Sequence, residues 1–268
     1  MFSTAFTYMA STTAAPSFSF LLDDYPNAAS AYSLRLLRSA YTGNCIEVRR
    51  SSDNTTQNIG FVNNELDTSS LLSFVGAGEG YIRTWYDQSG SGVNATQTTN
   101  SEQPRIVNGG VVETEGGKNS IRFTTTAPGT SMQFNPNVSQ PNSVFIVYQS
   151  DGIATGHIYD SQSRQLIGYT PGYVTYAGSA IVSYPTIPTT FGLVSAIFDG
   201  ANSVFQFNNG VDQTGNPGTA PFDSSLMFKG QGGSSATGYV SEFIVYSGDK
   251  SSSKAGIKTN INDYYSLY

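Results

Sequence analysis

The stretch AYSLRLLRSAYTG at residues 31–43, together with TWYDQSGSG further along the chain, decides the expected fold of the N-terminal part. Leu34, Leu37 and Tyr41 recur every three to four residues, a spacing typical of one face of a short helix. The glycine that ends the stretch is a common helix stop. We therefore expect a short helix at this position, followed by a strand.

The second stretch, at residues 84–92, is predicted to complete a strand and then enter a tight polar loop, because its residues alternate in character up to Trp85. We assign Trp85 to the core rather than to a platform for sugar rings. The loop residues favour turns, and we expect them to be structural: Asp87, Gln88, Ser89 and Gly90. A calcium ion bound by this loop and Asn94 is the alternative, but a single carboxylate supplies little charge, so we expect no metal.

The composition favours strands and turns over solvated helices. The chain has 28 glycines, 17 tyrosines and 16 phenylalanines in 268 residues, whereas charged residues make up only 12%. A formal net charge of -6 with only 13 lysines and arginines argues against the clustered basic surface that nucleic-acid binding requires. Cys45 is the sole cysteine, so an internal disulfide is excluded and the fold must depend on its core or on oligomer contacts.

We expect two parts, an N-terminal arm at residues 1–20 and a single β-sandwich domain at residues 21–268. The arm mixes aromatic and small polar residues without a clear period, which suits docking on a neighbouring subunit; a frayed terminus is the alternative. Residues 1–19 contain no lysine or arginine, which argues against a signal peptide. No run of 18 apolar residues predicts insertion into a membrane.

From residue 104 onward the sequence predicts short strands separated by glycine, proline, asparagine, aspartate and serine, as in a sandwich or barrel. The candidate strands lie at residues 105–107, 111–114, 120–123, 132–134, 143–149, 157–160, 165–169, 173–176, 192–198, 203–207, 226–228 and 238–246. Two helical segments flank this region. One begins at Thr68 and ends at a glycine. The other covers Ser251 to Leu267, is capped by Ser251 or Ser252, and carries Ile257 and Ile261 on one face.

Several phrases are similar to a known family, namely AYSLRLLRSAYTG (31–43), VRRSSDN (48–54), IGF (59–61), WYDQSG (85–90) and GYVSEF (238–243). They resemble the catalytic-domain family of α-L-arabinofuranosidase B, glycoside hydrolase family 54. This resemblance implies a mainly β fold, a concanavalin A-like jelly-roll β-sandwich with short N-terminal helices and a C-terminal helix.

The chain resembles bacteriophage virion and tail-fibre proteins more closely than secreted enzymes, because they share the LRSAYTG and YDQSG phrases. This resemblance implies a structural protein of the virion, such as a capsid decoration, a fibre subunit or an adaptor. The expected partners are other virion proteins, copies of itself and host surface glycan. We expect assembly in the host cytoplasm, without nucleic-acid binding and without a cofactor.

The residues that the family uses for catalysis are not found. A retaining glycosidase needs two carboxyl groups about 5 Å apart. The family nucleophile is a glutamate in a region that corresponds to residues 116–241, where this chain has none. Counting back from Gly238 places the family acid at Gln231, and the family's adjacent cysteine pair is missing. We therefore expect no catalytic residues, with a glycoside hydrolase that uses Asp151, Asp160 or Asp199 as the alternative.

Other candidate chemistry is limited. His157 is the only histidine, which argues against a histidine-based triad or metal site and favours a structural role in a strand. Four tyrosines with small, uncharged neighbours are candidates for contact with sugar rings or protein partners: Tyr169, Tyr173, Tyr176 and Tyr184. Packing within a sheet explains their spacing equally well, so both interpretations stay open. Gln231 completes the candidate ligand-binding set.

Overall fold

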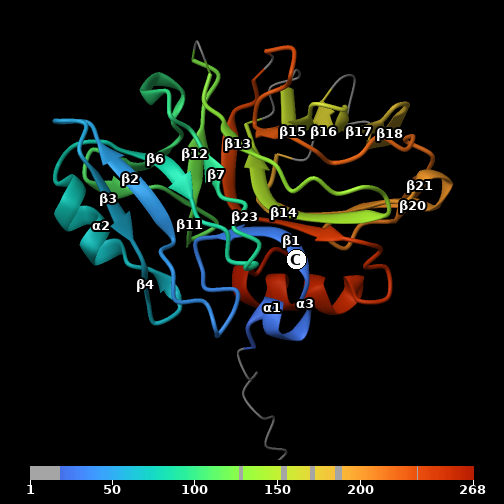
Figure 1. The fold of residues 1–268 in the computed structure, drawn as a ribbon, viewed down its shortest axis with the longest axis horizontal. Helices are drawn as coiled ribbons and strands as arrows, with labels where there is room; N and C mark the ends of the chain where they lie inside the picture. The colour runs from blue at the N-terminus through green and yellow to red at the C-terminus, as the bar shows by residue number, and fades with distance from the viewer. Residues whose placement is uncertain (1–18, 127–128, 152–155, 170–172, 185–188, 234) are drawn as a thin grey trace, which may run out of the picture.

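The computed structural model describes residues 19–126, 129–151, 156–169, 173–184, 189–233 and 235–268 (Figure 1). The predicted N-terminal arm lies outside these residues, apart from Ser19 and Phe20. The described chain pairs its principal strands into one extended antiparallel system that folds back on itself around a hydrophobic core. This architecture confirms the predicted mainly β sandwich.

One series of strands runs through the body of the molecule, and each strand is antiparallel to its neighbours. In spatial order they are β3 (Thr56–Ile59), β2 (Ile46–Arg50), β6 (Gly80–Trp85), β8 (Arg105–Asn108), β12 (Ile121–Phe123), β23 (Gly238–Ser247), β14 (Asn142–Ser150), β19 (Gly192–Phe198), β20 (Ser203–Phe207) and β21 (Gln213–Gly215). β1 (Ala28–Ser33) pairs with the later part of β23, beyond the residues that β12 contacts. The N-terminal and C-terminal regions are thereby joined along one strand.

A second series begins at β7 (Ala95–Thr96), which pairs with β6, and extends above β14 in Figure 1. Its further members are β13 (Met132–Phe134), β22 (Ser225–Met227), β15 (Gly156–Ser161), β16 (Gln165–Tyr169), β17 (Tyr173–Ala177) and β18 (Ala180–Tyr184). Short elements complete the fold: β9 (Val111–Val112), β4 (Phe61–Val62) with β5 (Glu65–Leu66), β10 (Thr114–Glu115) with β11 (Lys118–Asn119), and the 3-10 turns Asn100–Glu102 and Gly200–Asn202. Sequence reasoning did not predict β18 or β21.

β14 is buried on both faces. Successive side chains of a strand point to opposite sides, and here each side faces a hydrophobic core. Val144 and Ile146 enter the main core between the two series of strands. Phe145 and Val147 enter a second core under helices α1 (Leu21–Asp24) and α3 (Lys254–Tyr265). The middle of the central strand, residues 144–148, is accordingly a continuous run of apolar and aromatic side chains.

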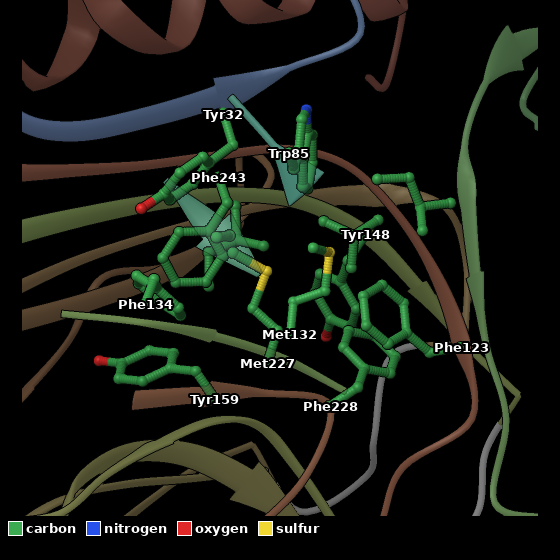
Figure 2. Packing of buried hydrophobic residues seen from close by; sticks show 14 of the residues in the cluster. Tyr32, Trp85, Phe123, Met132, Phe134, Tyr148, Tyr159, Met227, Phe228 and Phe243 are labelled. Atoms are coloured by element: carbon green, nitrogen blue, oxygen red, sulfur yellow. The ribbon is translucent and has the colours of Figure 1, made fainter. Parts of the chain in front are cut away.

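Aromatic side chains fill the main core (Figure 2). The ring of Tyr32 lies 5.8 Å from that of Trp85 and 5.5 Å from that of Phe134, and Phe134 lies edge-on to Phe243 at 5.2 Å. Such edge-to-face contacts add to the free energy of burial. Tyr159 of β15 belongs to the same core, so the following residue on that strand points toward the opposite face.

Helix α3 confirms the predicted C-terminal helix, with Ile257 and Ile261 buried. Its predicted start is wrong, since the helix begins at Lys254 and the preceding Ser253 makes no capping bond with its side chain. Helix α2 (Thr68–Val75) is likewise capped one residue earlier than predicted, by the side chain of Asp67. Among the described residues no helix is long and apolar enough to cross a membrane.

The helix predicted at residues 31–43 is also wrong. The first three residues of that stretch belong to β1, and the rest is irregular chain. The backbone N–H groups of Leu36 and Leu37 donate to Asn64 O and to Gln88 Oε1, each at 2.8 Å, instead of to carbonyls within a helix. Long-range hydrogen bonds therefore override the local helical spacing.

Candidate functional site

Asp160 is a fully buried carboxylate near the end of β15, where that strand pairs with both β16 and β22. Its Oδ2 atom accepts a hydrogen bond from Arg164 Nη1 at 2.7 Å and another from the backbone N–H of Gln231 at 2.8 Å. Arg164 follows the turn after β15 and has a positive φ of 69°, which returns the chain toward Asp160. The guanidinium group thus compensates the buried negative charge.

Gln231, the residue that the resemblance places at the family acid, lies in the turn between β22 and β23. Its side chain is exposed, and its amide nitrogen donates to the backbone carbonyls of Asp160 at 3.2 Å and Ser224 at 3.3 Å. A carboxamide has no acidic proton to give to a leaving oxygen at neutral pH. Gln231 therefore holds two strands together at the place where a hydrolase would need an acid.

His157 lies on the same strand, with its Nδ1 atom 4.0 Å from Asp160 Oδ2. Burial lowers the pKa of His157 and the Arg164 guanidinium lowers it further, whereas Asp160 acts in the opposite direction. Neither His157 Nδ1 nor Asp160 Oδ1 has a hydrogen-bond partner among the described residues. The imidazole is consequently neutral at pH 7 and does not provide a second charge to the cluster.

The three aspartates considered as alternative catalytic groups lie in different surroundings. Asp151 accepts two hydrogen bonds from Arg122, at 3.0 and 2.6 Å. Asp199 follows β19 and accepts from Asn202 at 3.1 Å. Within the described residues no hydrogen bond or ion pair joins either of them, or any other carboxylate, to the Asp160 cluster. Among the described residues the three aspartates therefore belong to separate hydrogen-bond networks.

The register of β16, β17 and β18 brings three of the four candidate tyrosines into line. Tyr169 is opposite Tyr173, and Tyr173 is opposite Tyr184. The side chains of these three residues lie outside the described part of the structure. Tyr176, which is half-buried, is instead opposite Leu166, which pairs with Asp160.

Tyr169 and Gln231 are at opposite ends of β15. Tyr169 pairs with Gly156, whereas Gln231 contacts Asp160, four residues further along the strand. At a rise of about 3.3 Å per residue the two ends are roughly 13 Å apart. The candidate ligand-binding residues are thus spread along β15 to β18, and Tyr176 is the candidate tyrosine that the strand register brings closest to Gln231.

The carboxylate of Asp87 is 5% exposed and accepts hydrogen bonds from two segments. Oδ1 accepts from the backbone N–H of Ala31 at 2.8 Å, and Oδ2 accepts from Val93 N at 3.2 Å and from the hydroxyls of Ser89 and Ser91, each at 2.8 Å. Both oxygens are therefore engaged by donors of the protein. Among the described residues no group of three or more histidine, cysteine, aspartate or glutamate side chains could hold a metal ion.

The neighbours of Asp87 complete this loop. Gln88 is fully buried and its amide nitrogen donates to the carbonyls of Ser33 and Arg35, at 3.0 and 3.1 Å. Gly90 has a φ of +94°, a backbone conformation that favours glycine over residues with a Cβ. Trp85, just before the loop, is fully buried. These contacts hold the loop against β1. The amide group of Gln88 is buried and bonded within the protein, so it does not face solvent.

Sequence reasoning missed the grouping of His157, Asp160 and Arg164. Their spacing of three and four residues across a hairpin turn was the available signal, because a tight turn returns the chain beside its own strand. It also missed an arginine-lined groove on β2, β6, β8 and β12. The adjacent pair Arg49 and Arg50 was the only sequence sign of that groove.

The fold and this cluster define a β-sandwich in which a buried carboxylate, Asp160, contacts Gln231, the residue that the resemblance places at the catalytic acid. The family described as "Alpha-L-arabinofuranosidase B, catalytic" matches residues 23–160, just over half of the chain. The chain belongs to this family. The comparison with curated proteins found no match.

Solved structures with the same fold include a glutamine mutant of a GH54 α-L-arabinofuranosidase soaked with 4-nitrophenyl α-L-arabinofuranoside, with a TM-score of 0.68 and 17% identity. Another is a GH54 enzyme soaked with a cyclic sulfate inhibitor, with a TM-score of 0.67 and 17% identity. A third is an arabinofuranosidase complexed with arabinofuranosyl-α-1,2-xylobiose, with a TM-score of 0.66 and 16% identity. Each match covers 87% of this chain but only 62% of the solved chain. At these identities the likeness shows the fold alone.

Proposed function

We propose that this chain is a glycan-binding β-sandwich that does not cleave glycosidic bonds. One observation carries the proposal: Gln231, which the sequence resemblance assigns to the family acid, is a carboxamide, and the carboxylate that it contacts, Asp160, is buried and paired with Arg164. Retaining hydrolysis requires one carboxyl group that donates a proton and a second that attacks the sugar. Gln231 cannot do the first, and Asp160 has no partner carboxylate within the described cluster.

Family membership supports the binding part of the proposal. Residues 23–160 match a family of carbohydrate-active domains, and solved structures with the same fold hold arabinofuranosyl ligands. A sandwich that recognises sugars through its surface can keep that ability when the reacting carboxylates are absent, because binding and bond cleavage depend on different groups. We therefore propose that this chain binds sugars but does not hydrolyse them.

We further propose a bacteriophage virion as the setting, with other virion proteins and copies of this chain as partners and host surface glycan as the ligand. Support comes from the phrases at residues 31–43 and 85–90, which resemble virion and tail-fibre proteins. The small share of charged residues also suits extended contacts between subunits. Electron microscopy of intact particles labelled with an antibody to this chain tests the setting.

Two assays test the function. The purified chain is incubated with 4-nitrophenyl α-L-arabinofuranoside and with arabinan, and we expect no release of nitrophenol or reducing ends above the buffer blank. Turnover that disappears in the Asp160→Asn variant would show a working hydrolase and refute the proposal. A glycan array combined with a pull-down on host cell envelope tests binding, where we expect retention. Absence of retention on both would remove the glycan-binding part.

A further inference from the structure

A row of three arginine and two tyrosine side chains crosses one face of the first series of strands. Register pairs Arg49 of β2 with Tyr81 of β6, Tyr81 with Arg105 of β8, Arg105 with Arg122 of β12, and Arg122 with Tyr239 of β23. Residues directly opposite each other in a sheet share a face. We call these five residues the arginine–tyrosine row.

Guanidinium groups stack on the rings of this row. The Arg49 guanidinium lies 4.8 Å from the centre of the Tyr81 ring, and that of Arg122 lies 4.6 Å from the centre of the Tyr239 ring. Stacking of this kind fixes the planes of the cations. A groove of about 590 Å³ lies along the row, bordered by hydroxyl and amide side chains that include Ser101 and Gln103. Its size is that of a small-ligand site.

Two of the three arginines in the groove are neutralised within the protein. Arg105 pairs with Glu113 at 2.7 Å and with Glu79 at 3.3 Å. Arg122 forms two hydrogen bonds with Asp151. These carboxylates compensate the two positive charges, so neither arginine needs a further anion.

Arg49 is different, because none of its partners among the described residues is a carboxylate. Nε donates to Gln103 Oε1 at 2.6 Å, Nη1 to Asn54 Oδ1 at 2.8 Å and Nη2 to the backbone carbonyl of Asn100 at 3.2 Å. The residue is only 7% exposed, and its burial lowers the pKa of the guanidinium group. These bonds use three of its five N–H groups, so two are left without a described partner.

We propose that the groove binds the carboxylate of an acidic sugar, a uronic acid unit of a polysaccharide, through Arg49. A buried cation without an anion is costly, and a planar carboxylate matches the fork of a guanidinium group. The hydroxyl and amide groups at the border suit the hydroxyls of the sugar ring. Glu79, Glu113 and Asp151 pair with the other two arginines of the groove, so Arg49 is its one arginine without a described carboxylate partner, which matches the single charge of a uronic acid unit.

This inference rests on the proposed glycan binding but assigns it to a surface that does not include Gln231 or Asp160. It also names the chemical class of the ligand. A hydrolase assay does not bear on it, whereas a comparison of acidic and neutral sugars does. The experiment is therefore chosen to separate the two proposals.

Binding of oligogalacturonate is measured by isothermal titration calorimetry and compared with the same oligosaccharide after reduction of its carboxyl groups to alcohols. We expect binding of the acidic form and at least about 10-fold weaker binding of the reduced form, the range of a lost charge-assisted hydrogen bond. Arg49→Gln should weaken binding of the acidic form by a similar factor. Arg50→Gln is the matched control, because Arg50 points to the opposite face of β2, pairs with Asp53 and should leave binding unchanged.

A second variant protects the test against misfolding of Arg49→Gln. Ser101 is exposed at the border of the groove, so Ser101→Glu adds a negative charge without disturbing buried packing. We expect Ser101→Glu to weaken binding of oligogalacturonate several-fold, with Ser101→Gln as its neutral control. Equal binding of acidic and reduced forms, or binding unaffected by Ser101→Glu, would overturn the inference. Retention of neutral glycans alone would do the same while leaving the proposed function intact.

Discussion

The buried ion pair between Arg35 and Glu242 offers the sharpest test of how this sandwich is stabilised. Nε of Arg35 lies 2.8 Å from Glu242 Oε2, Nη2 donates to Oε1 at 3.1 Å, and both side chains are 1% exposed. Ser33 Oγ donates to the same carboxylate at 2.8 Å, and the Tyr264 ring lies 4.8 Å from the guanidinium. Because water hardly reaches either side chain, each charge is stabilised mainly by the opposite charge of its partner.

We predict that Arg35→Met is strongly destabilising, because Glu242 is then left as a buried charge without its cation. Removing one partner of a buried ion pair costs about 3–5 kcal/mol. Against a typical unfolding free energy of about 5–15 kcal/mol, this is a large share. For a chain of this size it corresponds to a fall in Tm of roughly 6–20 °C.

Urea unfolding followed by the fluorescence of Trp85, the only tryptophan, measures this loss directly. Arg50→Met is the control, since Arg50 and Asp53 form an exposed pair with side chains 34% and 42% accessible, and such pairs contribute at most about 1 kcal/mol. The double variant Arg35→Met with Glu242→Leu should recover part of the loss, because no unpaired charge remains. If Arg35→Met costs no more than Arg50→Met, the reasoning is refuted.

Two further predictions concern the polar residues. Asp87→Ala should lower the unfolding free energy by at least about 2 kcal/mol, since the N–H groups of Ala31 and Val93 lose their acceptor; a stable, folded variant that fails to bind glycan would contradict this. Because folding holds the pKa of His157 below 6.5, the unfolded chain takes up the proton first as the pH falls, and stability is lost below about pH 6.5. We expect the free energy of unfolding in urea to fall less between pH 7.5 and pH 5.5 for His157→Gln than for the wild-type chain. An equal fall in both would contradict the assignment of this pH dependence to His157.

The strands were largely predictable from the sequence, because alternation and turn residues are local properties. Every candidate strand after residue 104 overlaps an observed strand, and the C-terminal helix is present at nearly its predicted position. β18 and β21 were not among the predicted strands. The helix expected at residues 31–43 is absent, since its apolar spacing is helical but its backbone partners lie elsewhere.

The sites were much less predictable, because they depend on register between distant strands. The arginine–tyrosine row joins residues from Arg49 to Tyr239 that no local pattern connects. The contact of Gln231 with Asp160 likewise spans 71 positions in the sequence. In each case the residue types were visible beforehand, whereas their neighbours required the paired strands.

The phrases that most resemble the family are the ones that hold the sandwich together. Arg35 of the first phrase binds Glu242 of the last, and Gln88 of the middle phrase binds the backbone of Leu37. The position that the resemblance assigns to the acid instead carries Gln231. Similarity concentrated in the scaffold therefore reports a shared fold and says little about a shared reaction. For such a chain the function has to be argued from the groups that face a ligand, and the uncompensated guanidinium of Arg49 is the most informative of those described.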